Sequence, residues 1–373
     1  MLQNKIYQNF SIEIIKTFML ILFGLSMIAL TVRAVGFLEL MVDSGYPVDI
    51  YFKYSLLNLF GVATKFIPFS FFLALTIFII KHSNNSEFSI LWTSGVKKIK
   101  IVNLFVLIAT LIMLLNLIFS VFFTPFALNK SRQLLSSDKF NSFLPTIKEQ
   151  QFSDTFKGFT LIVEKKIENE IQNIFLYDKN NILKNLSSNV SNTKDTTIIA
   201  KKGIVDTKKL ILIEGVIISS KKQGEKNEII KFDQLNINLN ELSTSTIKKP
   251  KLQELTTFKL LNCFQKEFNS DFCNTNSIKE IVPSLNRRII LPTYIPIIAL
   301  ICSLMLISAK RGRFVQILIY SMNFTLILFT ELALRYTGLN NIVLAFYIGL
   351  PIILIIFFYF YLIYKFSVEF KHI

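Results

Sequence analysis

The sequence predicts an α-helical membrane protein with six transmembrane helices, three before and three after an inserted all-β domain. Three observations predict this fold class. The 373 residues are 52% hydrophobic yet carry a formal net charge of +16, so the apolar and charged residues must lie in separate segments. Apolar runs long enough to cross a bilayer, which takes about 20 residues, occupy both ends of the chain. The middle of the chain has short apolar runs between polar turns, as β-strands have.

Six apolar segments are the expected transmembrane helices. Arg33 interrupts the first segment, and Lys65 and Pro68 interrupt the second. Helices buried in a soluble protein are the alternative, and six such segments in one chain make it improbable. The expected helices cover residues 15–41, 56–80, 101–126, 289–309, 314–334 and 342–364.

The basic residues of the short loops predict the orientation of the chain. Loops on the cytoplasmic side of a membrane carry an excess of Lys and Arg. One side offers only Lys53 and Arg335, with Arg33 inside the helix near that end. Both termini are therefore expected in the cytoplasm. The other side holds Lys5, Lys16, Lys81, Lys97, Lys98, Lys100, Lys310, Arg311, Arg313, Lys365 and Lys371.

The segment 130–288 is expected to form a separate domain on the non-cytoplasmic side. Long domains are exported regardless of their charge. The domain boundaries are thus predicted as 1–129, 130–288 and 289–373. After residue 242 the strand pattern stops, and residues 257–269 have helical spacing. The expected strands are 158–166, 173–179, 196–206, 209–221 and 229–239.

Enzyme signatures are missing from the sequence. It has no phosphate-binding Gly-rich loop, no dinucleotide fingerprint and no nucleophile elbow. The two His residues, His82 and His372, are both expected in the cytoplasm, and three Cys cannot build a four-Cys zinc site. We expect no catalytic residue, no metal, no cofactor and no nucleic-acid partner. Any energy source lies on another subunit.

The loop between the second and third predicted helices contains a short amphipathic helix. Glu87 lies in its first turn, where a carboxylate suits the helix dipole, and Gly95 ends it. Phe88, Leu91 and Trp92 fall on one face. One interpretation is an interfacial helix with Trp92 among lipid headgroups. The other is a coupling helix that fills a groove on a cytoplasmic ATPase.

The chain resembles the lipopolysaccharide export permease family, which supplies the paired membrane subunits F and G of one transporter. Ser86–Gly95 resembles the family's coupling motif, although Ser94 stands where Ala or Cys is commoner. The loop 42–47, Pro68 and the strand 158–164 also resemble family features. Lys310–Arg313 resembles a turn more typical of the F subunit.

The resemblance implies a fold, a function and a set of partners. The inserted domain would be a periplasmic β-jellyroll, and the chain would be a permease subunit of an ABC-type exporter in the inner membrane of a Gram-negative bacterium. It would extract lipopolysaccharide from the outer leaflet and pass it through the β domain. Its partners would be a homologous six-helix subunit, a cytoplasmic ATPase dimer and a periplasmic β-jellyroll bridge protein. The ATPase-coupling residues would be Glu87, Phe88, Leu91, Trp92, Ser94 and Gly95.

Two basic residues inside predicted helices are candidates for lipid contact. Arg33 lies near the outer leaflet, where it would suit a phosphorylated glycolipid; snorkelling or pairing with Glu39 or Glu331 is the alternative. Lys65 is a weaker candidate, because snorkelling explains it well. In the β domain, apolar strand residues would hold acyl chains, although core packing explains them equally well. Those candidates are Ile162, Phe175, Ile199, Ile211 and Ile213.

Two further residue pairs are predicted from spacing. Glu331 and Arg335, four residues apart in a helix, favour an ion pair, with a role in a gate between two subunits as the minority interpretation. Cys263 and Cys273 lie in the exported segment, where a disulfide and two unpaired thiols are both compatible with the sequence.

Two functions stay open besides an F-type transport subunit. One is the G-type partner subunit of the same exporter. The other is a membrane-anchored assembly protein whose β domain docks a partner. The layout of three helices on each side of the domain argues against an anchor.

Overall fold

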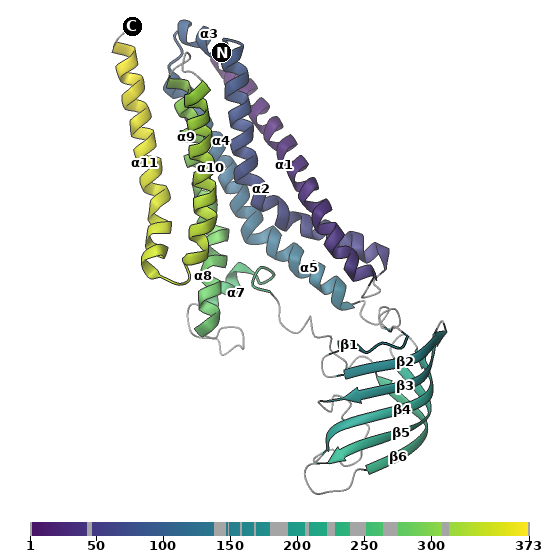
Figure 1. Cartoon of the computed structure of the whole chain (residues 1–373). Helices are drawn as coiled ribbons and strands as arrows, with labels where there is room; N and C mark the ends of the chain where they lie inside the picture. Colours follow the sequence, from purple (N-terminus) through teal and green to yellow (C-terminus); the bar gives the residue numbers. More distant parts are fainter. Residues whose placement is uncertain are drawn as a thin grey trace. The chain divides into compact units, whose positions relative to one another are not determined.

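The computed structural model of the chain describes residues 2–42, 47–137, 147, 149–156, 159–167, 169–179, 193–205, 209–221, 228–238, 251–263, 275–307 and 313–371. The chain divides into two compact units. One comprises Met1–Val32, Leu57–Asn129 and Lys251–Ile373, and we call it the helical unit. The other comprises Arg33–Leu56 and Lys130–Pro250, and we call it the β unit. Figure 1 labels their helices and strands.

Five described helices are long and apolar enough to cross a membrane. Helices α4 and α5 together form one of these five spans, because a π-helical turn at Phe119–Phe123 joins them. The helix bounds are α1 Leu2–Val42, α2 Val48–Asn84, α4 Lys98–Ile118, α5 Thr124–Ser137, α10 Arg313–Tyr336 and α11 Asn341–Lys371.

A sixth span is broken in two. Helix α8 (Thr275–Ile289) is followed by a 3₁₀ turn at Leu291–Tyr294 and by α9 (Ile295–Ser303), and the two halves bend by 46°. The predicted span 289–309 coincides with the second half, Leu291–Ile307, while the bend and the first half were not predicted. Pro292 and Pro296 lie just after the bend, and proline lacks the N–H that continues a helix. The described residues thus hold five candidate spans, or six if the bent pair is one.

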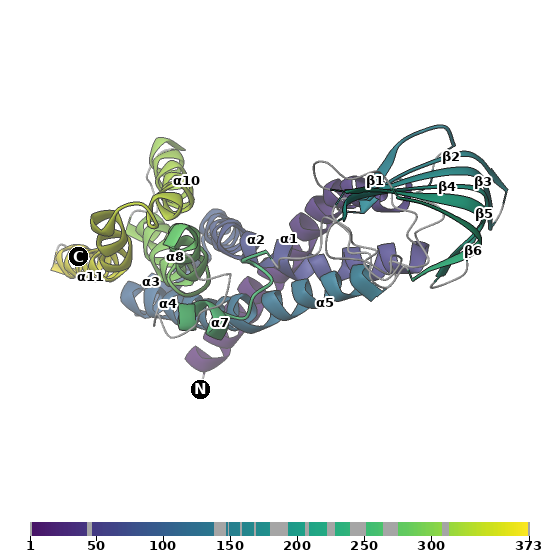
Figure 2. The ribbon, with the colours of Figure 1, turned by 90° about the horizontal axis from the view of Figure 1, so that it is seen from below.

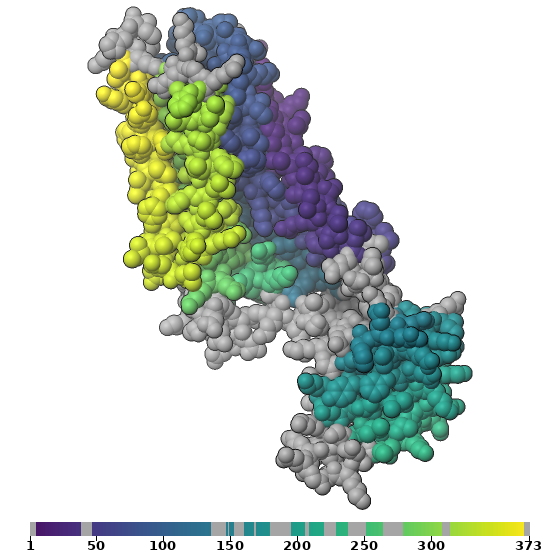
Figure 3. All heavy atoms as spheres, viewed as in Figure 1, coloured from purple at the N-terminus to yellow at the C-terminus, as the bar shows by residue number. Residues whose placement is uncertain are grey.

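The core of the helical unit is built around α9. Every residue of α9 is buried, and the helix packs against α4, α10 and α11. Tyr294, just before α9, donates a hydrogen bond from its hydroxyl to the carbonyl of Tyr347 in α11 at 2.8 Å. Helices α10 and α11 lie on the surface of the helical unit (Figure 3). They expose large apolar side chains, as lipid-facing helices do. Among them are Ile317, Leu332, Ile352 and Phe357.

The β unit contains a six-stranded antiparallel sheet whose strands follow one another in chain order. Figure 2 shows that the sheet is curved. The all-β prediction is confirmed. A jellyroll pairs two sheets through Greek-key connections, whereas the described strands form one open sheet. The strands are β1 Ser153–Phe156, β2 Phe159–Ile167, β3 Glu170–Asp178, β4 Thr193–Val205, β5 Lys209–Lys221 and β6 Glu228–Asn238.

The five predicted acyl-chain candidates do not lie on the buried face of this sheet. Ile199 is 46% exposed, and Ile162, Phe175, Ile211 and Ile213 are half-buried. Strand residues alternate between faces, so the buried face consists of the residues that precede or follow these five candidates along the strands. The sequence could not fix the phase because isoleucine occurs on both faces. The buried positions are Leu161, Val163, Ile174, Leu176, Ile198, Ala200, Leu210 and Leu212.

The helical unit also includes the segment that follows the sheet. Leu260 of α7 (Thr257–Asn262) is buried with Ile281 and Leu285 of α8. Residues 251–288 therefore belong with the helices, and the domain boundary predicted at residue 288 lies inside the helical unit. The helix predicted over 257–269 is present to residue 262, and residues 264–269 lie outside the described part.

Candidate functional site

Helix α3 (Glu87–Thr93) is the short helix predicted between the second and third spans. Gly95 has φ of 86°, the left-handed region that glycine adopts most easily. The N–H of Gly95 bonds to the carbonyl of Trp92 at 3.1 Å, and that of Val96 to the carbonyl of Leu91 at 3.1 Å. This pair of bonds is a Schellman motif, which ends a helix by satisfying its last carbonyls.

The apolar face of α3 points into its own chain. Phe88 is 4% exposed, and its ring lies 6.3 Å from those of Phe10 in α1 and Phe78 in α2. Trp92 stacks on Phe88 at 5.8 Å with the ring planes 8° apart. Leu91 and Trp92 are half-buried against the same core. This face thus packs in this chain's own core, whereas the sequence left it between lipid headgroups and a groove on a partner.

The opposite face of α3 is open. Ile90 is 65% exposed, and Ser89, Thr93 and Ser94 are also exposed. Both chain termini lie at the same end of the helical unit as α3 (Figure 1). Ile90 is the large apolar side chain on this exposed face, beside three small polar ones.

Lys98 holds the end of α3 to its neighbours. Its ammonium lies 5.9 Å from the centre of the Trp92 ring and 5.7 Å from that of Phe366 in α11. Cations at this distance are attracted to aromatic rings. The position of α3 is thus tied to α4 and α11.

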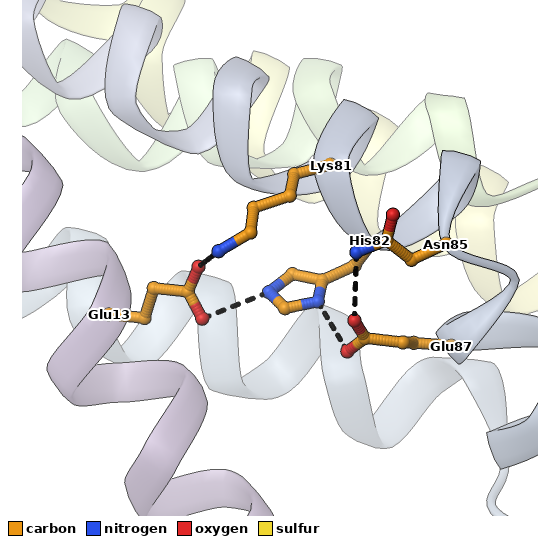
Figure 4. Close-up of polar contacts among 5 residues, drawn as sticks. All are labelled: Glu13, Lys81, His82, Asn85 and Glu87. Atoms are coloured by element: carbon orange, nitrogen blue, oxygen red, sulfur yellow. Dashed lines mark hydrogen bonds and ion pairs between the residues drawn. The ribbon is translucent and has the colours of Figure 1, made fainter.

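A polar network joins α3 to α1 and α2 (Figure 4). Glu87 lies 2.6 Å from Nδ1 of His82 and accepts a hydrogen bond from Asn85 at 3.2 Å. Nε2 of His82 lies 3.2 Å from Glu13 of α1, whose other oxygen pairs with Lys81 at 2.7 Å. The His82 side chain is 5% exposed, whereas that of Glu87 is 40% exposed. Glu87, predicted to meet a basic residue of an ATPase, already has a basic partner within this chain.

Sequence reasoning missed the other members of this network. It placed Lys81 and His82 in the cytoplasm but gave neither a partner, and it did not consider Glu13. The available signal was a histidine five residues before Glu87, at the end of an apolar run. The contact with Glu13 joins residues far apart in the chain, so no local pattern points to it.

Glu331 has a different partner from the one predicted. Its carboxylate accepts a bond from Nη2 of Arg287 in α8 at 2.7 Å, while Arg335 is exposed. The ion pair therefore crosses from α10 to α8, in place of the pair with Arg335 within α10. Both side chains of the observed pair are partly exposed, so it adds little to stability by itself.

The lipid candidates Arg33 and Lys65 are both exposed. Arg33 lies on α1 in the part of this helix that belongs to the β unit. There Tyr51 of α2 donates from its hydroxyl to the carbonyl of Ala34 at 3.0 Å, which holds the two helices together. Among the side chains that the structure describes, no carboxylate pairs with Arg33; that of Glu39 is outside them.

Residues 12–365 match the model of the family described as Lipopolysaccharide export system permease LptF/LptG. The chain belongs to this family. A comparison with curated proteins gave no match. Membership makes the chain a lipopolysaccharide export permease, and its apolar helices fit a multi-pass inner-membrane protein. The family is one of transporter subunits.

Three motifs that suggested this family fall partly outside the described residues. The structure leaves out 43–46 of the loop 42–47, and Gly158, Lys310, Arg311 and Gly312. Pro68 lies inside α2, which continues through it.

The cysteines of the permease are in different states. Cys263 is disulfide-bonded, while Cys302 is a free, buried thiol. Cys273 lies outside the described residues, so its pairing with Cys263 stays a prediction. Within the described ranges, no cluster of three or more His, Cys, Asp or Glu could hold a metal ion.

Proposed function

We propose that this chain is the F-type membrane subunit of an ABC-type lipopolysaccharide exporter. It extracts lipopolysaccharide from the outer leaflet of the inner membrane and passes it through the β unit to a periplasmic bridge protein. A homologous six-helix subunit completes the path, and a separate cytoplasmic ATPase dimer drives it. The match of residues 12–365 to the permease family supports the exporter role, and the resemblance of Lys310–Arg313 to an F-subunit turn supports the F-type assignment. Both termini and α3 then face the cytoplasm.

The α3 geometry supports the coupling step. A helix that transmits force must be fixed on one side and exposed on the other. Phe88 is fixed in the core, and Ile90 is 65% exposed. In this proposal the ATPase contacts Ile90 and its exposed neighbours, while Phe88 holds α3 to the membrane helices.

A detergent pull-down of the tagged chain, expressed at native level and analysed by mass spectrometry, tests the proposal. We expect a homologous six-helix partner, an ATPase dimer and lipid A species, and the identity of the partner then separates an F-type from a G-type chain. Recovery of the chain alone, or with a periplasmic enzyme or sensor kinase, would mean that the β unit is a docking module instead.

Ile90→Asp is expected to release the ATPase in the same experiment. Burying an isoleucine stabilises a contact by about 1.5–3 kcal/mol, and 1.4 kcal/mol is about tenfold in affinity. ATPase recovery should thus fall at least about tenfold. Ile90→Val, the matched control, should retain the ATPase, because it keeps most of the apolar surface. Equal recovery with both variants would exclude a docking role for this face.

Arg33→Ala is expected to reduce lipid contact. An arginine within a spanning helix is costly unless it faces a cavity or a partner, and its guanidinium binds phosphate through two hydrogen bonds. Crosslinking of lipopolysaccharide to α1 and growth of the cells should both fall, while Arg335→Ala, also an exposed arginine, leaves crosslinking unchanged. Normal crosslinking and growth with Arg33→Ala would rule out this contact.

A further inference from the structure

His82 lies buried where three helices meet. Its ring centre is 5.0 Å from that of Phe10 in α1, 4.1 Å from Phe78 in α2 and 5.9 Å from Phe88 in α3. Only 5% of the side chain is exposed, so water cannot satisfy the ring nitrogens. A buried polar group needs partners from the protein, and the positions of those partners reveal which protons the ring must carry.

Both ring nitrogens face carboxylate oxygens. Nδ1 lies 2.6 Å from Glu87, and Nε2 lies 3.2 Å from Glu13. A neutral imidazole has one donor and one acceptor, whereas an ionised carboxylate only accepts. If the ring were neutral, its bare nitrogen would face a carboxylate oxygen, and both atoms would be hydrogen-bond acceptors. An imidazolium donates to both carboxylates.

The neighbouring groups favour ionised carboxylates. Glu13 receives the ammonium of Lys81 at 2.7 Å on its other oxygen, and Glu87 receives the amide of Asn85 at 3.2 Å. One oxygen of each carboxylate therefore accepts from these neighbours, and the other oxygen of each faces the ring. The charged groups that face the ring are Glu13 from α1, Lys81 from α2 and Glu87 from α3. If His82 is an imidazolium, its charge and the charges of these three side chains sum to zero.

We propose that His82, as an imidazolium, is the positioning residue that couples α3 to α1. It donates one bond to Glu87 and one to Glu13, so a displacement of α3 is passed directly to α1. Among the described side chains, no other hydrogen bond or ion pair links α3 to α1. Arg33 lies further along the same helix. This inference rests on the proposed function, because it assumes that the ATPase moves α3.

The protonation state is tested first, in a way that does not depend on transport. The chain has two histidines, so histidine labelled with the heavy nitrogen isotope gives NMR signals from only two rings in lipid nanodiscs, and His82→Gln assigns them. At neutral pH we expect the His82 signal of a ring with both nitrogens protonated. A ring with one bare nitrogen would overturn the proposal.

Coupling is tested in the assembled exporter as the stimulation of ATP hydrolysis by lipopolysaccharide. His82→Gln and Glu13→Gln should each abolish stimulation, and the double variant should be no worse, because both break one link. Glu13→Gln keeps the shape of a partly exposed side chain, so it tests the link even where His82→Gln fails to fold. Lys53→Gln, at an exposed lysine of α2 outside this network, is the matched control and should retain stimulation.

The NMR signal separates a coupling role from a merely structural one, because a histidine that only fills the core does not need both ring nitrogens protonated. Normal stimulation in both Gln variants would overturn the proposal. An unmodified exporter without any response to lipopolysaccharide would contradict the proposed function itself, and the NMR result would still decide the protonation of His82.

Discussion

Arg288→Met is expected to loosen the segment that leads from the β unit into the membrane helices. Arg288 is 5% exposed and lies in α8. Its guanidinium donates to Thr257 Oγ1 at 3.0 Å and to three backbone carbonyls of the preceding segment. The three carbonyls belong to Leu252 at 3.0 Å, Gln253 at 3.3 Å and Leu255 at 2.9 Å.

Methionine keeps the aliphatic part of the side chain but supplies no donor. Four buried or half-buried acceptors then lose a charged partner, and breaking such an arrangement costs about 3 kcal/mol or more. Thermal unfolding in detergent should shift to a clearly lower temperature. Trypsin should also cut faster at Lys251 and Lys259, because the segment between them is no longer held on α8.

Two further variants define what Arg288 contributes. Thr257 accepts from Arg288 and donates to the carbonyl of Val121 at 3.0 Å, so Thr257→Val should cost about 1 kcal/mol. Arg335→Met removes an exposed arginine and should change the free energy of unfolding by less than about 0.5 kcal/mol. Equal unfolding temperatures for Arg288→Met and Arg335→Met would refute the anchoring role.

The fold was predictable where a local pattern determines it. Span lengths and the ends of α3 follow from runs of apolar residues and from Gly95, whose conformation is set by its own backbone. The break near Pro292 could have been read from the sequence, because two prolines close together interrupt helix bonding. The buried face of the sheet could not be read from the sequence, because Ile198 and Ile199 are equally apolar neighbours and only the packing of the whole sheet distinguishes them.

The candidate site was predictable only in part, because its contacts are tertiary. The spacing of Glu331 and Arg335 favours a pair within one helix, but α8 presents Arg287 to the same carboxylate. The apolar face of α3 was recognised, whereas its direction depends on Phe10 and Phe78 from other helices. Periodicity identifies a face and says nothing of what covers it.

Gly338→Ala is expected to displace the turn between α10 and α11 from α8. A Cβ atom at Gly338 would lie 1.9 Å from the carbonyl oxygen of Lys279, 2.8 Å from the carbonyl carbon of the same residue and 2.9 Å from Cδ of Pro283. The nearest two atoms are backbone of α8, so no side-chain rotation relieves the clash. Overpacking costs about 1–3 kcal/mol, and this contact lies at the upper end because a helix must shift.

Gly349→Ala is the matched control for this prediction. Gly349 lies in α11 with nothing within 4 Å of its Cβ position, and alanine favours a helix over glycine by up to about 1 kcal/mol. Thermal unfolding should therefore drop for Gly338→Ala and hold or rise for Gly349→Ala. Equal unfolding temperatures for the two variants would refute the clash between Gly338→Ala and the backbone of α8.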